Sequence, residues 1–106
     1  MPDDISPDEL RAWLAQSRPI VLLDVRDAWE TKLCRLDNAL HIPMEELEFR
    51  TEELNPTEEI VVYCHHGVRS AAVADYLRRL GFTRVRNLSG GLDAWARAVD
   101  PSMRRY

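Results

Sequence analysis

The sequence predicts an α/β fold in which an open parallel sheet carries helices on both faces. Short apolar and β-branched runs at residues 20–25 and 59–63 alternate with segments whose apolar residues recur at helical spacing. The connections between these segments are short, so successive strands are expected to lie parallel, with a helix crossing between them. A length of 106 residues fits one domain that spans residues 1–106.

The first half of the chain alternates helix and strand signals. Ser6, Pro7 and Glu9 form a capping box with proline at the first helical position, which predicts a helix to about residue 17. The run at 20–25 is typical of a strand covered on both faces. Three shorter elements are then expected: a capped helical turn from Asp27 to Glu30, a strand at 39–42 that ends at Pro43, and a helical stretch at 44–49.

The strongest strand signal lies at 59–63 and leads directly into Cys64. The elements expected after it are a helix that begins near Ser70 and has Gly81 as its left-handed C-cap, a strand at 84–88 and a helix at 92–99. In parallel sheets, ligands gather at the carboxyl ends of the strands, which is where Asp24 and Cys64 fall.

The composition is that of a folded domain. Hydrophobic residues make up 45% and charged residues 30% of the sequence, which supplies enough apolar surface for a core. The apolar runs are far shorter than the roughly twenty residues that cross a bilayer, and residues 1–9 lack the basic and apolar regions of a secretory signal. We therefore expect no membrane partner and a cytoplasmic location.

The charges are distributed unevenly along the chain. The net charge of −4 tells against nucleic acid as a partner, since phosphate neutralisation needs a basic surface. Residues 1–60 hold 15 Asp and Glu against 6 Lys and Arg, whereas residues 61–106 hold 3 against 8. A small anion is therefore expected at the second half, unless its arginines are only a solvated face.

Cys34 and Cys64 are the two cysteines, and they stand in no CxxC or zinc-finger pattern. Neither a disulfide scaffold nor a structural metal is indicated, and no cofactor is expected. Both thiols are expected to be free and reduced. Cys34 is either an inert, partly buried residue or a redox partner.

The best predicted strand is joined to the best predicted helix by Cys64-His65-His66-Gly67-Val68-Arg69-Ser70. A loop that ends at a helix N-terminus directs backbone N–H groups and the positive end of the helix dipole into its bowl. A cysteine there, with Arg69 nearby, has its pKa lowered and becomes a nucleophile at neutral pH. The alternative is that Cys64 is a small apolar residue that closes a core strand.

Two local features leave alternatives open. His65 and His66 either take part in binding and proton transfer, or supply only backbone N–H groups while their rings face solvent. Asp24 and Arg26 are either a charged pair that holds the strand end or two solvated side chains. A metal site built from Cys64, His65 and His66 is disfavoured, because adjacent residues rarely converge on one ion.

Motifs over about residues 5–100 resemble those of single-domain rhodaneses. They are Leu23-Asp24-Val25-Arg26, His41-Ile42-Pro43, the cysteine loop with Arg69-Ser70, Asn87-Leu88-Ser89-Gly90-Gly91 and Ala94-Trp95. Leu40 stands where the family commonly has glycine, and the turn chemistry of Asp37-Asn38 survives without it. The resemblance implies a rhodanese-like fold and sulfur transfer with a persulfide on Cys64.

The length of the loop distinguishes two chemistries. Four residues separate Cys64 from Arg69, whereas phosphatases and arsenate reductases of the rhodanese fold use one residue more. A shorter loop makes a bowl that crowds a tetrahedral oxyanion, so sulfur is favoured over phosphate.

We therefore expect a rhodanese-type thiosulfate:acceptor sulfurtransferase with Cys64 as the catalytic residue. A small anionic sulfur donor loads it, and cyanide, a thiol or a sulfur-carrier protein accepts the outer sulfur. The residues expected to bind substrate are His65, His66, Gly67, Val68, Arg69 and Ser70. The alternative is a non-catalytic adaptor, and a phosphatase or arsenate reductase is less favoured.

Overall fold

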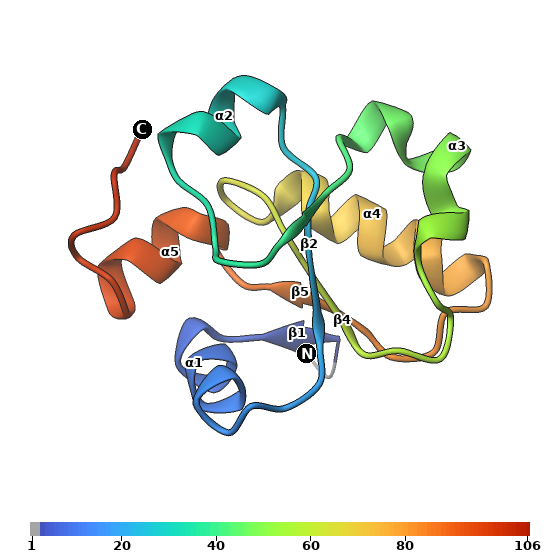
Figure 1. Cartoon of the computed structure of the whole chain (residues 1–106), viewed down its shortest axis with the longest axis horizontal. Coiled ribbons are helices and arrows are strands. Elements are labelled where there is room, and N and C mark those ends of the chain that lie inside the picture. Colours follow the sequence, from blue (N-terminus) through green and yellow to red (C-terminus); the bar gives the residue numbers. More distant parts are fainter. Residues whose placement is uncertain (1–2) are drawn as a thin grey trace.

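A computed structural model of the chain describes residues 3–106 as strands that alternate with helices (Figure 1). The strands are β1 (Asp4–Ile5), β2 (Val21–Asp24), β3 (Leu40–His41), β4 (Ile60–Tyr63) and β5 (Val85–Leu88). The helices are α1 (Pro7–Ala15), α2 (Ala28–Leu33), α3 (Leu47–Arg50), α4 (Val68–Arg79) and α5 (Gly91–Ala98), with two 3-10 turns, η1 (Met44–Glu46) and η2 (Thr51–Glu53).

All pairs of neighbouring strands are parallel, and their order across the sheet is β1-β5-β4-β2-β3. The central strand β4 is buried along its whole length. Its register with β2 places Tyr63 beside Asp24, so both strands end at the same edge of the sheet. Cys64 follows β4 at that edge. The parallel pairing of the strands confirms the predicted parallel α/β sheet.

The side chains of β4 alternate between two apolar layers, as the pleat of a strand requires. Ile60, Val62 and Cys64 pack in the layer that α3 and α4 cover. Val61 and Tyr63 pack in the layer that α1 and α5 cover. Figure 1 shows these two helix pairs on opposite sides of the sheet, so the prediction of helices on both faces is confirmed.

The helix signals read from the sequence correspond to real caps. Ser6 Oγ accepts a hydrogen bond from the Glu9 N–H over 3.1 Å, and Glu9 Oε1 accepts from the Ser6 N–H over 3.0 Å. Gly81, just past the end of α4, has the left-handed φ of 99° that was expected. None of the helices within residues 3–106 is long and apolar enough to cross a membrane.

α2 runs to Leu33, beyond the predicted turn at Asp27 to Glu30, and the predicted helical stretch at 44–49 is three short pieces, η1, α3 and η2, that end at Glu53. The structure differs from the predicted elements at two further places. α4 begins at Val68 rather than near Ser70, because Gly67 adopts a left-handed φ of 96° and turns the loop into the helix earlier. The sequence pattern did not predict β1. Its two residues form a strand only by pairing with Asn87 and Leu88 of β5, a contact no local pattern reveals.

Candidate active site

The Cys64 thiol lies where β4 ends and faces the first turn of α4. Only 1% of Cys64 is exposed. The backbone N–H of Gly67 donates to Cys64 Sγ over 3.1 Å, and that of Ser70 over 3.4 Å. A Cβ at Gly67 would lie 3.2 Å from the backbone nitrogen of Gly90, so glycine lets the loop approach this neighbour closely. The sulfur therefore lies in a narrow bowl of backbone donors.

Opposing effects act on the acidity of Cys64. Burial raises the pKa of the thiol, but hydrogen bonds from the Ser70 hydroxyl and from the N–H groups of Ser70, Gly67 and His66 outweigh burial. The net result is a pKa below the ordinary value of a cysteine. More thiolate is therefore present at neutral pH than in a free cysteine.

The Ser70 hydroxyl has one proton and two neighbouring acceptors. Its Oγ lies 3.3 Å from Cys64 Sγ and also donates to Asn87 Oδ1. Asn87 Nδ2 donates to the Gly67 carbonyl over 3.2 Å, which turns Oδ1 toward Ser70. A neutral thiol donates to Ser70 Oγ, whereas a thiolate needs the Ser70 proton for itself. Asn87 therefore competes with the thiolate for this proton.

The N-terminus of α5 holds the loop from its other side. The N–H of Leu92 donates to the Cys64 carbonyl and the N–H of Asp93 to the His65 carbonyl, each over 3.0 Å. Gly91 has a φ of 61°, and a Cβ added there would lie 2.6 Å from the Cys64 carbonyl oxygen. A side chain at position 91 would therefore displace the loop.

Arg69 pairs with Glu30 at the partly exposed edge of the loop, which we call the rim. Its Nη1 and Nη2 donate to the two carboxylate oxygens of Glu30 over 2.7 and 2.8 Å. These hydrogen bonds lower the pKa of Glu30 to about 2, although burial acts in the opposite direction. Sequence reasoning recognised Glu30 only as a capping residue, because its partner lies 39 positions away.

Tyr106 is a second rim residue that the sequence did not reveal. Its hydroxyl accepts from Arg26 Nη1 over 2.9 Å and donates to Glu30 Oε1 over 2.8 Å. Its ring stacks on His65 at a centroid distance of 3.7 Å and meets Trp29 edge-on at 5.9 Å. Burial raises the pKa of the phenol, so it stays protonated at neutral pH. Tyr106 therefore ties the rim to residues far away in sequence.

The Asp24 and Arg26 side chains form a buried ion pair at 2.7 Å. The solvated alternative is therefore wrong. Arg26 also donates to the Cys34 carbonyl over 2.7 Å and lies 3.8 Å from Cys34 Sγ. Cys34 is half-buried and free, so this arginine anchors the end of α2 beside the site.

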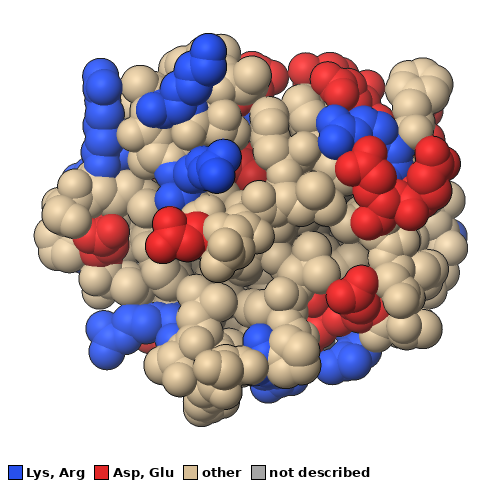
Figure 2. All heavy atoms as spheres, in the orientation of Figure 1, with Lys and Arg blue, Asp and Glu red and all other residues tan. Residues whose placement is uncertain are grey.

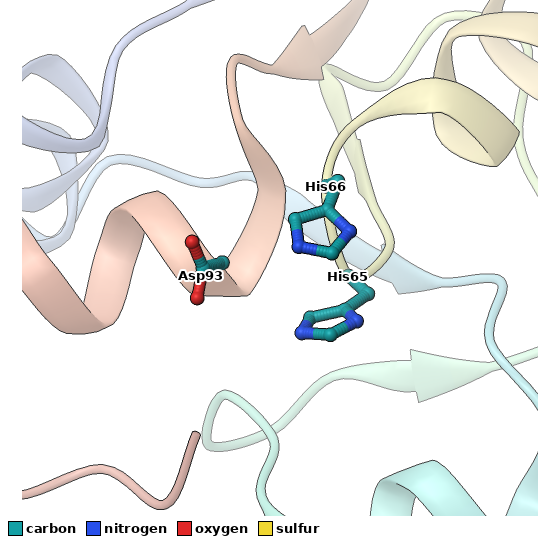
Figure 3. A group of neighbouring side chains, drawn as sticks. All are labelled: His65, His66 and Asp93. Atoms are coloured by element: carbon teal, nitrogen blue, oxygen red, sulfur yellow. The ribbon is translucent and has the colours of Figure 1, made fainter. Parts of the chain in front are cut away.

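Within the described range 3–106, His65, His66 and Asp93 form a group that could hold a metal ion, with ligand atoms within 4.8 Å of one another (Figure 3). The Asp93 carboxylate already pairs with Arg105 at 3.0 Å and Arg97 at 3.5 Å. The centroids of the two imidazole rings are 3.9 Å apart, and the rings are tilted by 30° to one another. Burial, with His66 nearby, lowers the pKa of His65, so this ring is neutral at neutral pH. These contacts favour an ion-paired rim over a metal centre.

The predicted site residues surround the sulfur in different ways. Gly67 and Ser70 contact it directly. The Nε2 atom of His65 is buried and has no hydrogen-bond partner among residues 3–106, whereas His66 is exposed. Val68 is 78% exposed and lies outside the bowl. The loop therefore combines buried donors with an exposed outer surface.

Comparisons with known proteins relate the chain to one family. The sequence matches the rhodanese-like domain over residues 6–98. A sulfurtransferase of Allochromatium vinosum is 35% identical over 97 residues, which cover 92% of this chain and 91% of that protein. Thiosulfate sulfurtransferase GlpE of Coxiella burnetii is 39% identical over 87 residues, 81% of each chain. A rhodanese-like domain protein from Staphylococcus aureus has the same fold, with a TM-score of 0.85, 34% identity and 98% of both chains covered.

Proposed function

The chain belongs to the rhodanese-like domain family, and from this premise we propose that it is a sulfurtransferase that carries a persulfide on Cys64. The observation that carries the proposal is a buried sulfur that receives backbone N–H bonds from Gly67 and Ser70. These donors stabilise a thiolate before the reaction and a persulfide after it. The name of the Coxiella relative, a thiosulfate sulfurtransferase, supports thiosulfate as the donor.

In the loading step, the Cys64 thiolate attacks the outer sulfur of thiosulfate. An S–S bond forms at Cys64, the S–S bond of thiosulfate breaks, and sulfite leaves with the electron pair. In the second step an acceptor attacks the outer sulfur of the persulfide, and the Cys64 thiolate leaves. Cyanide becomes thiocyanate, and a thiol or sulfur-carrier protein gains a persulfide, so the cycle needs no external oxidant.

The loop residues divide the work of binding. Backbone N–H groups between His65 and Ser70, including those of His66, Gly67 and Val68, hold the charge on the persulfide. Arg69 orients the anionic donor, since no described residue hydrogen-bonds its Nε while its Nη groups pair with Glu30. The cytoplasm is the compartment that suits this chemistry, because reducing conditions keep the thiol available between turnovers.

Intact-mass measurement after incubation with thiosulfate tests the proposal. The wild-type protein should gain one sulfur atom, which cyanide or dithiothreitol removes. Cys64→Ser should gain none and keep the circular-dichroism spectrum of the folded chain. An unchanged wild-type mass would favour a non-catalytic adaptor, and turnover of aryl phosphates by the wild-type protein would favour a phosphatase.

A further inference from the structure

A groove of about 300 Å³ lies between α4 and the segment formed by η1 and α3. Ala72 and Tyr76 line its α4 side, and Met44, Glu45 and Glu48 line the opposite side. None of these residues contributes to the bowl around Cys64. The groove is therefore separate from the bowl, although both are bounded by α4.

An apolar stripe connects the groove with the active-site loop. Val68, Ala72 and Tyr76 follow one another at four-residue spacing and so lie on one face of α4. Val68 is 78% exposed, Tyr76 36%, and Met44 across the groove 40%. Val68 directly follows Gly67, whose N–H reaches the catalytic sulfur. Exposed apolar surface next to a reactive group marks an interaction site.

The wall of the groove opposite α4 carries unpaired negative charge. Glu45 and Glu48 are exposed, and neither side chain forms an ion pair or hydrogen bond with any residue in the range 3–106. Glu46 and Glu53, in contrast, both pair with Arg50. Figure 2 shows acidic side chains gathered over α3 and its flanking turns. Such a wall favours a partner that carries lysine or arginine.

We propose that this groove docks the protein that accepts sulfur from Cys64, through an aliphatic side chain flanked by Lys or Arg. The inference rests on the proposed function, because an acceptor is needed only if Cys64 carries sulfur. Ala72 and Tyr76 lie about 6 to 12 Å beyond Val68 along the helix, and three extended residues span about 10 Å. The acceptor thiol is therefore about three residues away from the docking side chain.

Two synthetic peptides that differ only in charge test the groove. They are acetyl-Lys-Leu-Lys-Gly-Cys-amide, in which the thiol is three residues from the leucine, and the same peptide with both lysines replaced by glutamate. Thiosulfate-loaded protein is mixed with each, and mass spectrometry follows the peptide persulfide. The cationic peptide should accept sulfur about tenfold faster at low salt, and added salt should reduce the difference. Equal rates would overturn the proposal.

Two double charge reversals distinguish the effect of charges in the groove from the effect of the protein's net charge on the peptide preference. Glu45→Lys combined with Glu48→Lys should invert the preference between the peptides. Glu52→Lys combined with Glu58→Lys makes the same change in net charge at exposed positions outside the groove, and should preserve the preference. Both double variants should transfer sulfur to cyanide at the wild-type rate. An equal response of the two variants to the peptides would exclude the groove.

A binding measurement distinguishes this proposal from the one on which it rests. Fluorescent peptides with Ser in place of Cys should bind the unloaded protein with the same charge preference, measured by anisotropy. A protein that loads sulfur but shows no preference in either assay overturns the docking groove alone. A protein that never loads sulfur overturns the proposed sulfurtransferase function, whatever it binds.

Discussion

The inner and outer sides of the loop from Cys64 to Ser70 are built by different means. On the inner side, the sulfur of Cys64 contacts backbone N–H groups of Gly67 and Ser70, which the path of the chain puts in place. On the outer side, Arg69 pairs with Glu30 through long side chains that meet across the sheet edge. The inner contacts are buried, whereas the Arg69 side chain is 34% exposed.

This difference separates the contacts that change the reactivity of Cys64 from those that stabilise the loop. Backbone donors around a buried atom change its pKa directly, because no water competes with them. A partly exposed ion pair does less to the sulfur and more to the stability of the loop, since water screens its field. We therefore expect changes on the inner side to alter reactivity, and changes at the rim residues other than Arg69, which we propose to orient the donor, to alter mainly stability.

The largest effect is expected for Gly91→Ala. The new Cβ would collide with the carbonyls of His65 and Cys64 and would force a left-handed φ on alanine. Thiosulfate loading should fall more than about a hundredfold, with about 3 kcal/mol of unfolding free energy lost. Loading kinetics and urea denaturation measure the two effects.

Gly81→Ala is the matched control for this substitution. Gly81 also has a positive φ, 99°, but nothing lies within 4 Å of a Cβ added there. The Gly81→Ala variant should lose about 1 kcal/mol of unfolding free energy and should load sulfur at the wild-type rate. If the two variants loaded sulfur at the same rate, Gly91 would have no special part in holding the loop.

Ser70→Ala should have the next largest effect, and on reactivity rather than on folding. Loss of the hydroxyl removes a hydrogen bond from the thiolate, so the pKa of Cys64 rises. Loading at pH 7 should fall about tenfold, since one hydrogen bond to a charged group is worth about 1.5 kcal/mol. The rate of iodoacetamide alkylation against pH should shift to higher pH. Ser102→Ala, at an exposed position, should leave the pH profile of alkylation unchanged. If Ser70→Ala had the same profile as the wild-type protein, the Ser70 hydroxyl would not stabilise the Cys64 thiolate.

The inner side could be predicted because its parts are contiguous. A strand signal that ends at Cys64, a glycine and a helix signal from Ser70 onward fix where the backbone donors must point. Asn87 was recognised as part of a motif but received no role. Its amide bonds to Ser70 and Gly67 depend on how β5 lies beside β4, and no local pattern gives that side-chain contact.

The rim could not be predicted, because its contacts join distant positions. Glu30 and Arg69 are 39 residues apart, and Tyr106 and Arg26 are 80 residues apart. Glu30 had a sufficient local explanation as a capping residue, and its N-cap bond to Asp27 is indeed present at 2.9 Å. When one side chain makes both a local and a long-range contact, a single sequence indicates only the local contact, here the capping box and not the ion pair with Arg69.

Glu30→Gln tests the rim through pH. The pKa of Glu30 falls from 4.5 to about 2 on folding, so its ion pair with Arg69 stabilises the protein above pH 4.5 and is lost as the pH falls through about 2. At pH 7 the variant should be less stable by about 2 kcal/mol, after allowance for screening of the partly exposed Arg69. The difference in unfolding free energy between the variant and the wild type, measured by urea denaturation, should be smaller at pH 3.

Glu53→Gln is the control for this pH effect, because it alters an exposed pair with Arg50. It should change stability little at either pH. A stability gap for Glu30→Gln that is equal at pH 7 and pH 3 would mean that the Arg69 ion pair does not stabilise the fold.

The smallest effect is expected for Tyr106→Phe. The substitution removes the hydroxyl between Arg26 and Glu30 but keeps the ring stacked on His65. Arg26 remains held by the buried carboxylate of Asp24, so only about 1 kcal/mol of unfolding free energy should be lost. Thiosulfate loading should stay within about twofold of wild type.

Tyr106→Ala also removes the ring that stacks on His65. The greater exposure of His65 should raise the pKa of its imidazole, and NMR titration would measure the change. Loss of loading in Tyr106→Phe would place the phenol in the reactive machinery and erase the distinction between the two sides of the loop.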